Sequence, residues 1–368
     1  MTSISASKVY TPGKVLSNVS ISFEKGSITS IQSFDGLPTY RHICAPFFDT
    51  HINGGEKHYL TEDNSEAAID DIFRASYQTG TFYVLPTIIT SSLENILKSF
   101  EVMRSYRKKH PTSGVIGMHL EGPFLNPVKR GAHLAKYVRI PTDSEIKTIL
   151  ENGKDLIKIW TIAPEQFTQS QIKMILDAEI CTSVGHSNAT ANESKSAFSM
   201  GINLVTHLYN AMSGLHHRKP GLVGATLANK EVWAPIIIDG KHCDFEAAKV
   251  AFNAKTERLF LISDALFLGR KKIEFKWEEF DAKLINGEYI NSDGNLAGSA
   301  ISMGEAVYNA VHEVDIPLET AIEMSTERPF RALGLDPKLG QIKEGSPAIF
   351  TSFNDELTTF EVLDFRNQ

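Results

Sequence analysis

Eight short apolar segments recur along the middle of the chain, and most of them end on a polar residue able to take part in chemistry. They are residues 43–51, 81–87, 115–121, 156–165, 179–186, 203–207, 232–239 and 258–264. Amphipathic stretches lie between most of them, and eight strands alternating with helices over about 250 residues are typical of a (β/α)8 barrel. An open, doubly wound sheet is the alternative fold. Its dinucleotide-binding version has no support, because no Gly-x-Gly-x-x-Gly sequence follows the first segment.

Four Ser/Thr-x-x-Glu/Gln sequences mark expected helix starts between these segments. In such a capping box each of the two side chains accepts a hydrogen bond from the other residue's backbone N–H. The pairs are Ser91 with Glu94, Thr142 with Glu145, Thr168 with Gln171 and Thr190 with Glu193. Their positions support the alternation of strands with helices.

Both ends of the chain show a different pattern, one of short strands. Residues 19–23 and 28–31 alternate apolar and polar side chains around a turn, which is typical of a hairpin with one face in solvent. Residues 348–350 and 360–363 are similar. We therefore predict an α/β protein, with a (β/α)8 TIM-like barrel and a second, smaller β domain built from both chain ends. The expected domain ranges are 1–45 and 335–368 for the β domain and 46–334 for the barrel.

Composition excludes several classes of partner. The net charge of −7 provides no basic surface for nucleic acid, and no apolar run approaches the roughly 20 residues of a membrane span. The three cysteines lie far apart, which argues for a reducing compartment and against a disulfide framework or a thiolate zinc site. The first 20 residues lack the apolar core of a signal peptide. We expect a cytoplasmic protein.

In a barrel, the residues that end the strands converge on one face. Here those ends would bring carboxylates and imidazoles together, which are the ligands of a divalent metal such as Zn²⁺. The residues are His51 and Asn53 from the first strand, Glu121 from the third, His186 from the fifth, His207 from the sixth and Asp264 from the eighth. A single histidine is more often structural than a ligand. It is much less expected by chance that residues able to bind a metal stand at the ends of several independent strands.

Glu121, His186 and His207 would leave one coordination position for water, which is the catalytic rather than the structural arrangement. Metal lowers the pKa of bound water from about 15.7 towards 7, giving a nucleophile at neutral pH. Asp264 would then act first as general base and later as general acid. Its alternative role is to cap a helix or to support a ligand.

Longer motifs resemble a known family. They are residues 46–55 (PFFDTHINGG), 85–90 (LPTIIT), 119–126 (HLEGPFLN), 185–190 (GHSNAT), 206–212 (THLYNAM), 218–222 (RKPGL), 239–242 (DGKH), 263–265 (SDA), 296–299 (LAGS) and 340–348 (GQIKEGSPA). On these motifs the chain resembles the amidohydrolase superfamily, and within it the group that deacetylates N-acetylglucosamine 6-phosphate. The resemblance extends in order over essentially the whole chain.

The resemblance implies roles for individual residues. One divalent metal per subunit, Zn²⁺ before Fe²⁺, Mn²⁺ or Co²⁺, would be held by Glu121, His186 and His207. Asp264 would shuttle protons and His133 would polarise the acetyl carbonyl. The sugar phosphate would contact His133, Asn210, Ala211, Arg218, His242 and Leu296. The expected assembly is a homodimer with shared active sites, in which Arg218 reaches into the partner's pocket.

Two departures from the family pattern are visible. Many members carry His-x-His on the first strand and bind two metals, whereas the second position here is Asn53. We expect one tightly held metal, with a second, weaker one at His51 and Asn53 left as an alternative. Residues 267–272 also lack the small, glycine-rich character that the family shows after the catalytic aspartate.

The expected reaction is metal-dependent hydrolysis of the acetamide of N-acetylglucosamine 6-phosphate to glucosamine 6-phosphate and acetate. The alternatives are N-acetylgalactosamine 6-phosphate as the substrate, or another amidohydrolase reaction such as opening of a cyclic amide. Cyclic amidases rank lower because they commonly place a bridging lysine where Glu121 stands. A glycosidase using Glu121 and Asp264 would leave His186 and His207 without a role. A barrel that only binds a sugar phosphate would not need Asp264.

Overall fold

Eight parallel strands form a closed barrel within residues 2–367, which are the residues that the computed structural model describes. They are β5 (Phe47–Ile52), β6 (Thr81–Ile89), β7 (Met118–Glu121), β8 (Ile157–Ile162), β9 (Cys181–Val184), β10 (Leu204–Val205), β11 (Ala234–Ile236) and β12 (Leu259–Leu261). Strands β5 to β10 make one sheet and β11 pairs with β12. Single bridges, Leu204 to Trp233 and Ile52 to Ala265, close the ring. The barrel prediction is confirmed.

The buried carboxylate of Asp49 strengthens the closure between β5 and the segment after β12. It accepts hydrogen bonds from the hydroxyl and the backbone N–H of Ser263 and from the backbone N–H of His51. Burial raises the pKa of Asp49 to about 6, and these donors oppose the increase. The first and last strands are therefore joined by side-chain as well as backbone hydrogen bonds.

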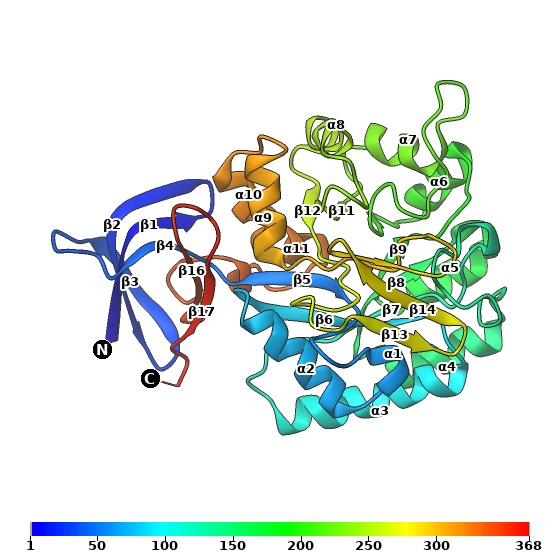
Figure 1. Cartoon of the computed structure of the whole chain (residues 1–368), viewed down its shortest axis with the longest axis horizontal. Helices are drawn as coiled ribbons and strands as arrows, with labels where there is room; N and C mark the ends of the chain where they lie inside the picture. Colours follow the sequence, from blue (N-terminus) through cyan, green and yellow to red (C-terminus); the bar gives the residue numbers. More distant parts are fainter. Residues whose placement is uncertain (1, 368) are drawn as a thin grey trace.

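Helices surround this barrel (Figure 1). They are α1 (Leu60–Asp63), α2 (Glu66–Tyr77), α3 (Leu93–Lys109), α4 (Asp143–Gly153), α5 (Gln169–Leu176), α6 (Ala191–Ser199), α7 (Gly221–Ala228), α8 (Phe245–Lys255), α9 (Met303–His312), α10 (Leu318–Ser325) and α11 (Glu327–Ala332), with the short 3-10 helices η1 (Pro127–Lys129), η2 (Pro164–Gln166) and η3 (Pro337–Gly340). None of the helices found between residues 2 and 367 is long and apolar enough to cross a membrane.

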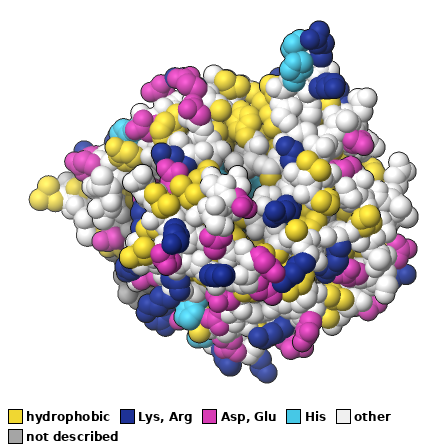
Figure 2. Space-filling view, turned by 45° about the vertical axis from the view of Figure 1, so that its right-hand side comes forward, with side chains coloured by type: hydrophobic (Ala, Val, Ile, Leu, Met, Phe, Trp, Pro, Cys, Tyr) yellow, Lys and Arg dark blue, Asp and Glu magenta, His cyan; other side chains and the backbone are white. Residues whose placement is uncertain are grey.

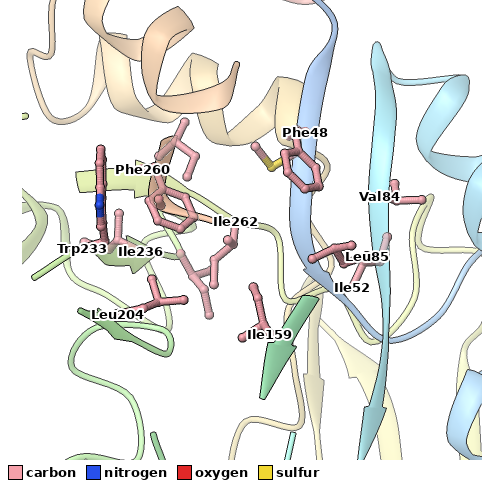
Figure 3. Close-up of a cluster of buried hydrophobic side chains, with 14 of the residues drawn as sticks. Phe48, Ile52, Val84, Leu85, Ile159, Leu204, Trp233, Ile236, Phe260 and Ile262 are labelled. Carbon is pink, nitrogen blue, oxygen red and sulfur yellow. The ribbon is translucent and has the colours of Figure 1, made fainter. Parts of the chain in front are cut away.

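The barrel strands are almost entirely buried because one face lines the interior and the other faces the helices. All nine residues of β6 are buried. Figure 3 shows such side chains from six of the strands and their ends, among them Phe48, Ile159, Trp233 and Phe260. This two-sided burial explains why the strands appear in the sequence as continuous apolar runs.

The helix starts follow the predicted caps with one exception. Helices α5 and α6 begin with complete capping boxes, at Thr168–Gln171 and Thr190–Glu193. At α4 the Thr142 side chain accepts from the Glu145 N–H, as expected. The prediction for α3 is wrong by one residue: Ser92, not Ser91, is the cap, and it accepts from the N–H of Asn95.

Both chain ends pair into one separate sheet, beside the barrel in Figure 1, which confirms the second β domain. Its order is β17-β16-β4-β1-β2-β3. The strands are β1 (Thr2–Thr11), β2 (Lys14–Glu24), β3 (Ser27–Ser33), β4 (Tyr40–Cys44), β16 (Ile349–Phe353) and β17 (Phe360–Asp364). The segment 43–51, expected as one strand, is divided between β4 and β5 at Ala45 and Pro46. A proline has no N–H for a sheet and favours such a break. The exact domain boundaries stay a prediction.

A three-stranded antiparallel sheet lies between β12 and α9 in the chain, and the sequence did not predict it. It consists of β13 (Glu274–Trp277), β14 (Phe280–Ile285) and β15 (Glu288–Ile290). Phe275, Phe280 and Tyr289 from this sheet form an aromatic cluster with Tyr59 and Phe267. The inserted sheet is thus attached to the loop that follows the first barrel strand.

The buried Arg328 of α11 gives a test of the barrel's packing. Its guanidinium donates to the carbonyls of Thr256, at 2.6 Å, and Leu259, at 3.0 Å. Arg328→Met should lower the free energy of unfolding by about 1.5–3 kcal/mol, because both carbonyls lose a charged donor. Arg74→Met, at an exposed i,i+4 pair with Asp70, should cost at most about 0.5 kcal/mol. Urea denaturation measures both, and equal losses would contradict this role of Arg328.

Candidate active site

Three ligand atoms meet at the carboxyl ends of the barrel strands. Oε1 of Glu121, Nε2 of His186 and Nε2 of His207 lie 3.1 Å from one another in all three pairs. Glu121 is the last residue of β7, and the two histidines follow β9 and β10. All three side chains are buried. The backbone therefore delivers three metal-ligand groups from three different strands to one point.

The protonation of these groups fits a cation. Nδ1 of His186 lies 2.8 Å from the carbonyl oxygen of Lys129, which can only accept a hydrogen bond, so the ring proton is on Nδ1. The lone pair on Nε2 is then directed at Glu121. A carbonyl acceptor behind a metal-binding imidazole is a usual arrangement. Tetrahedral Zn²⁺ with bonds of about 2.0–2.1 Å places its ligand atoms about 3.4 Å apart, close to the separation found here.

Two further histidines approach the other carboxylate oxygen of Glu121. Nε2 of His51 lies 3.3 Å from Oε2, and Nε2 of His133 lies 3.5 Å from it. The possible ligand atoms of Glu121, His133 and His186 lie within 4.8 Å of one another. His207 is nevertheless nearer to Glu121, at 3.1 Å, than His133 is, at 3.5 Å. Burial alone would raise the pKa of the Glu121 carboxyl, but the surrounding imidazoles hold it well below its usual range. Glu121 is therefore an anion.

Asp264 follows β12 and lies next to this cluster. Its Oδ1 accepts a hydrogen bond from Nδ2 of Asn53 at 2.8 Å and lies 3.2 Å from Nε2 of His51. Asn53 thus directs its amide N–H to Asp264, and it orients the aspartate. His51 lies between the carboxylates of Asp264 and Glu121, where it could also contact a second ion. The structure places the two residues considered for a second metal on the Asp264 side of the cluster.

His133 lies in the loop after β7, and its tautomer follows from its neighbours. The backbone N–H of Thr90 donates to Nδ1 of His133 at 3.3 Å, so the ring proton is on Nε2. The guanidinium of Arg130 donates to the backbone carbonyl of His133 at 2.9 Å and holds the loop. His133 therefore presents an N–H donor beside Glu121.

His242 follows β11, four strands around the ring from β7. Its Nδ1 lies 2.6 Å from Oδ2 of Asp239, whose other oxygen accepts the backbone N–H groups of Lys241 and His242. Burial alone would lower the pKa of His242, but the hydrogen bond and charge of Asp239 outweigh it, and the pKa is raised. His242 therefore keeps its proton to higher pH than an ordinary histidine, which suits an anion.

A cavity of about 170 Å³ connects these groups. Of the residues predicted for the site, those that line it are Asn53, Glu121, His133, His186, His207, Asn210, Ala211, His242, Asp264 and Leu296. His51 contacts Glu121 and Asp264 without lining it. The sequence did not identify Tyr59, Ile89 and Phe280 as lining residues. Ile89 lies in a family motif, but no pattern in the sequence brings Phe280 to this place.

Arg218 is the predicted residue that lies away from its own cavity and from the residues that line it. It lies in a tight turn in which His216 and Lys219 form an antiparallel bridge, and its side chain is exposed. In Figure 1 the segment that precedes α7 in the chain projects from the surface near α7 and α6, and the projection at the top of Figure 2 carries histidine and basic side chains. In this arrangement Arg218 therefore does not line the cavity of its own chain.

Comparison with known proteins agrees with this geometry. A sequence model of the amidohydrolase family matches residues 43–367. N-acetylglucosamine-6-phosphate deacetylase of Haemophilus influenzae is 34% identical, over 85% of this chain and 82% of that enzyme. N-acetylgalactosamine-6-phosphate deacetylase of a Shewanella strain is 34% identical, over 95% of this chain and 91% of that enzyme. The crystal structure of N-acetylglucosamine-6-phosphate deacetylase from Pasteurella multocida has a TM-score of 0.90 and 30% identity, covering 97% of both chains.

A parallel barrel with a buried Glu–His–His cluster, together with a family match over most of its length, defines the class: the chain belongs to the amidohydrolase family. The relatives that it resembles within this family are deacetylases of N-acetylhexosamine 6-phosphates.

The geometry predicts which variants lose metal. His186→Ala and Glu121→Gln should each purify with little bound metal, because each removes one of three ligands from the cluster. Elemental analysis of the folded proteins measures this directly, without an assay of activity. His58→Ala, at a half-exposed histidine paired with Asp63, is the control and should keep its metal. Full metal content in both site variants would contradict the ligand assignment.

Proposed function

We propose that the protein is a metal-dependent deacetylase that hydrolyses the acetamide of N-acetylglucosamine 6-phosphate to glucosamine 6-phosphate and acetate. The observation that carries the proposal is the meeting of Glu121, His186 and His207 at 3.1 Å beside Asp264. His242 lines the same cavity, and its raised pKa favours a positively charged ring. This charge supports the proposal that the substrate carries a phosphate. The deacetylase relatives, matched over most of their length, support the same substrate class.

Glu121, His186 and His207 would hold the metal. Zn²⁺ is the ion we propose, because two imidazoles, one carboxylate and an open position form a catalytic zinc ligand set. Fe²⁺, Mn²⁺ and Co²⁺ are chemical alternatives, since imidazole and carboxylate ligands also accept them. When bound, the metal would lower the pKa of water from about 15.7 towards 7 and so supply the nucleophile.

The chain's own residues would handle the protons. Asp264, oriented by the amide of Asn53, accepts a proton from the attacking water and then gives it to the sugar nitrogen as the C–N bond breaks. His133, with its proton on Nε2, donates to the acetyl carbonyl oxygen and stabilises the negative charge that develops there. The low pKa of the Glu121 carboxyl makes it unsuitable as the proton donor of a glycosidase.

The phosphate would lie at the opposite end of the cavity. His242 offers a charge-assisted hydrogen bond through Nε2, because Nδ1 is occupied by Asp239. Asn210 and Ala211 would add contacts from the loop after β10, and Leu296 would pack against the sugar. N-acetylgalactosamine 6-phosphate is the second candidate substrate, because the Shewanella relative is matched over 95% of this chain.

Acetate release from a panel of N-acetyl sugars, with and without 6-phosphate, tests the proposal. N-acetylglucosamine 6-phosphate should be turned over fastest, chelation should abolish release, and added Zn²⁺ should restore it. His242→Ala should lower kcat/KM for the phosphorylated sugar by about 10- to 100-fold, the value of a charged hydrogen bond, and affect the unphosphorylated sugar much less. His110→Ala, at an exposed histidine, is the control. Absence of acetate release by the metal-loaded protein from every sugar of the panel would refute the function.

We also propose a homodimer with shared active sites in a cytoplasmic setting. The exposed turn with Arg218 lies outside its own cavity and projects from the surface, so a two-fold partner could receive it. A two-fold interface is self-complementary, and each chain would lend its arginine to the other. The cysteines are free, with Cys44 and Cys243 buried, which agrees with a reducing compartment.

Mixing two inactive variants tests the shared site. Asp264→Asn and Arg218→Ala would be co-expressed with different tags, so that about half of the dimers are mixed by random pairing. In a mixed dimer one of the two sites combines an intact Asp264 with an intact Arg218, so about a quarter of wild-type activity should return under two-fold symmetry. No recovery, with mixed dimers isolated by both tags, would mean that Arg218 serves its own chain.

A further inference from the structure

The two ends of the cavity lie on opposite sides of the barrel. His242 and Ala211 follow β11 and β10, whereas His133 and Ile89 belong to the β7 loop and the end of β6. In a ring of eight strands these pairs are four positions apart. If the phosphate lies at His242, as the proposed function has it, the acyl group lies over β5 to β7, beside His133. The inference below rests on that function.

The acyl end of the cavity has an apolar wall. Ile89 and Tyr59 line it from the barrel side, and Phe280 of β14 lines it from the inserted sheet. Phe280 is only 4% exposed. Its ring centroid lies 6.0 Å from that of Tyr59 and 5.7 Å from that of Phe275. A methyl group fits such a wall, and the ring of Phe280 stands where a longer acyl chain would extend.

A second cavity of about 340 Å³ lies behind this wall. It shares two lining residues with the first cavity, Phe280 and Ala132, so these two side chains separate the cavities. Its other walls include the polar side chains of Arg130, Lys136 and Asn291. This second cavity adjoins Phe280 and Ala132, and removal of the Phe280 ring would open it to a longer acyl chain from the first cavity.

The position of Phe280 is held by ion pairs on its own turn. Glu278 and Glu279, just before β14, lie 3.1 and 3.0 Å from Nζ of Lys136. The hydroxyl of Tyr137 donates to Glu278 at 3.0 Å. Lys136 and Tyr137 belong to the loop that carries His133. The inserted sheet is therefore fastened to the catalytic loop at the point where Phe280 enters the cavity.

We propose that Phe280 is a specificity-determining residue that restricts the hydrolysed acyl group to acetyl. The residue limits chain length by shape and takes no part in proton transfer. Hydrolysis of a longer amide would follow the same balance: the C–N bond breaks, the oxygen of one water joins the acyl carbon, and the nitrogen gains the proton. With a smaller side chain at position 280, the acyl chain would extend into the second cavity.

The test compares kcat/KM of the metal-loaded enzyme on the 6-phosphates of N-acetyl-, N-propionyl- and N-butyrylglucosamine, by release of the carboxylate. Wild type should lose roughly 10-fold or more for each added methylene. Phe280→Ala should raise the butyryl-to-acetyl ratio at least tenfold over wild type. The value of kcat/KM for the butyryl substrate should itself exceed that of wild type, which is a gain of activity that a damaged protein cannot imitate. Phe280→Leu should raise the butyryl-to-acetyl ratio by a smaller amount. If Phe280→Ala fails to fold, the ratio of the leucine variant tests the inference.

Phe275→Ala is the matched control, because it removes the same side chain from the same aromatic cluster without lining either cavity. The butyryl-to-acetyl ratio of this control should equal that of wild type. Wild type that already accepts butyryl as well as acetyl, or a Phe280 variant that turns over acetyl with an unchanged ratio, would overturn the inference and leave the deacetylase function intact. Absence of acetate release from wild type would instead overturn the function itself.

Discussion

A buried negative charge is the constraint around which the site is built. Glu121 is only 3% exposed, and an uncompensated carboxylate at that depth would cost several kcal/mol. His51 and His133, whose Nε2 atoms lie 3.3 and 3.5 Å from its Oε2, compensate part of this charge. Burial alone would lower the pKa of His51, but Asp264 and Glu121 raise it to about 9. On the other side of the carboxylate, Oε1 and the Nε2 atoms of His186 and His207 form the ligand set that a divalent cation requires.

The backbone that carries the residues of the site is strained. His186, His207, Ala211 and Asp264 all have positive φ, at 46°, 32°, 52° and 48°, although none is a glycine. Such conformations are costly for side-chain-bearing residues and tend to persist at functional sites, where the surrounding structure enforces them. Here the closed barrel does so: His186, His207 and Asp264 each lie two or three residues beyond a buried strand, so the packed core fixes the backbone of the polar rim.

The inserted sheet adds what the barrel cannot supply. The residues that we propose as metal ligands, as acid–base groups and as the phosphate contact all come from the rim of the barrel. The cover over the acyl end comes from β14, whose Phe280 packs on Tyr59 after the first strand. The proposed chemistry and the proposed acyl selectivity therefore have separate structural origins, the first in the rim of the barrel and the second in the inserted sheet.

Local patterns in the sequence were enough to predict the barrel, the two-ended β domain and the residue types at the strand ends. Apolar runs and capping residues act over a few neighbours, so they can be recognised without the fold. Tertiary structure alone decided four features of the protein. They are the division of residues 43–51 between two sheets, the hydrogen bond from Asn53 to Asp264, the entry of Phe280 into the cavity and the position of Arg218 away from it. Each depends on contacts between segments far apart in the chain, and the hydrophobic periodicity of the sequence does not reveal such contacts.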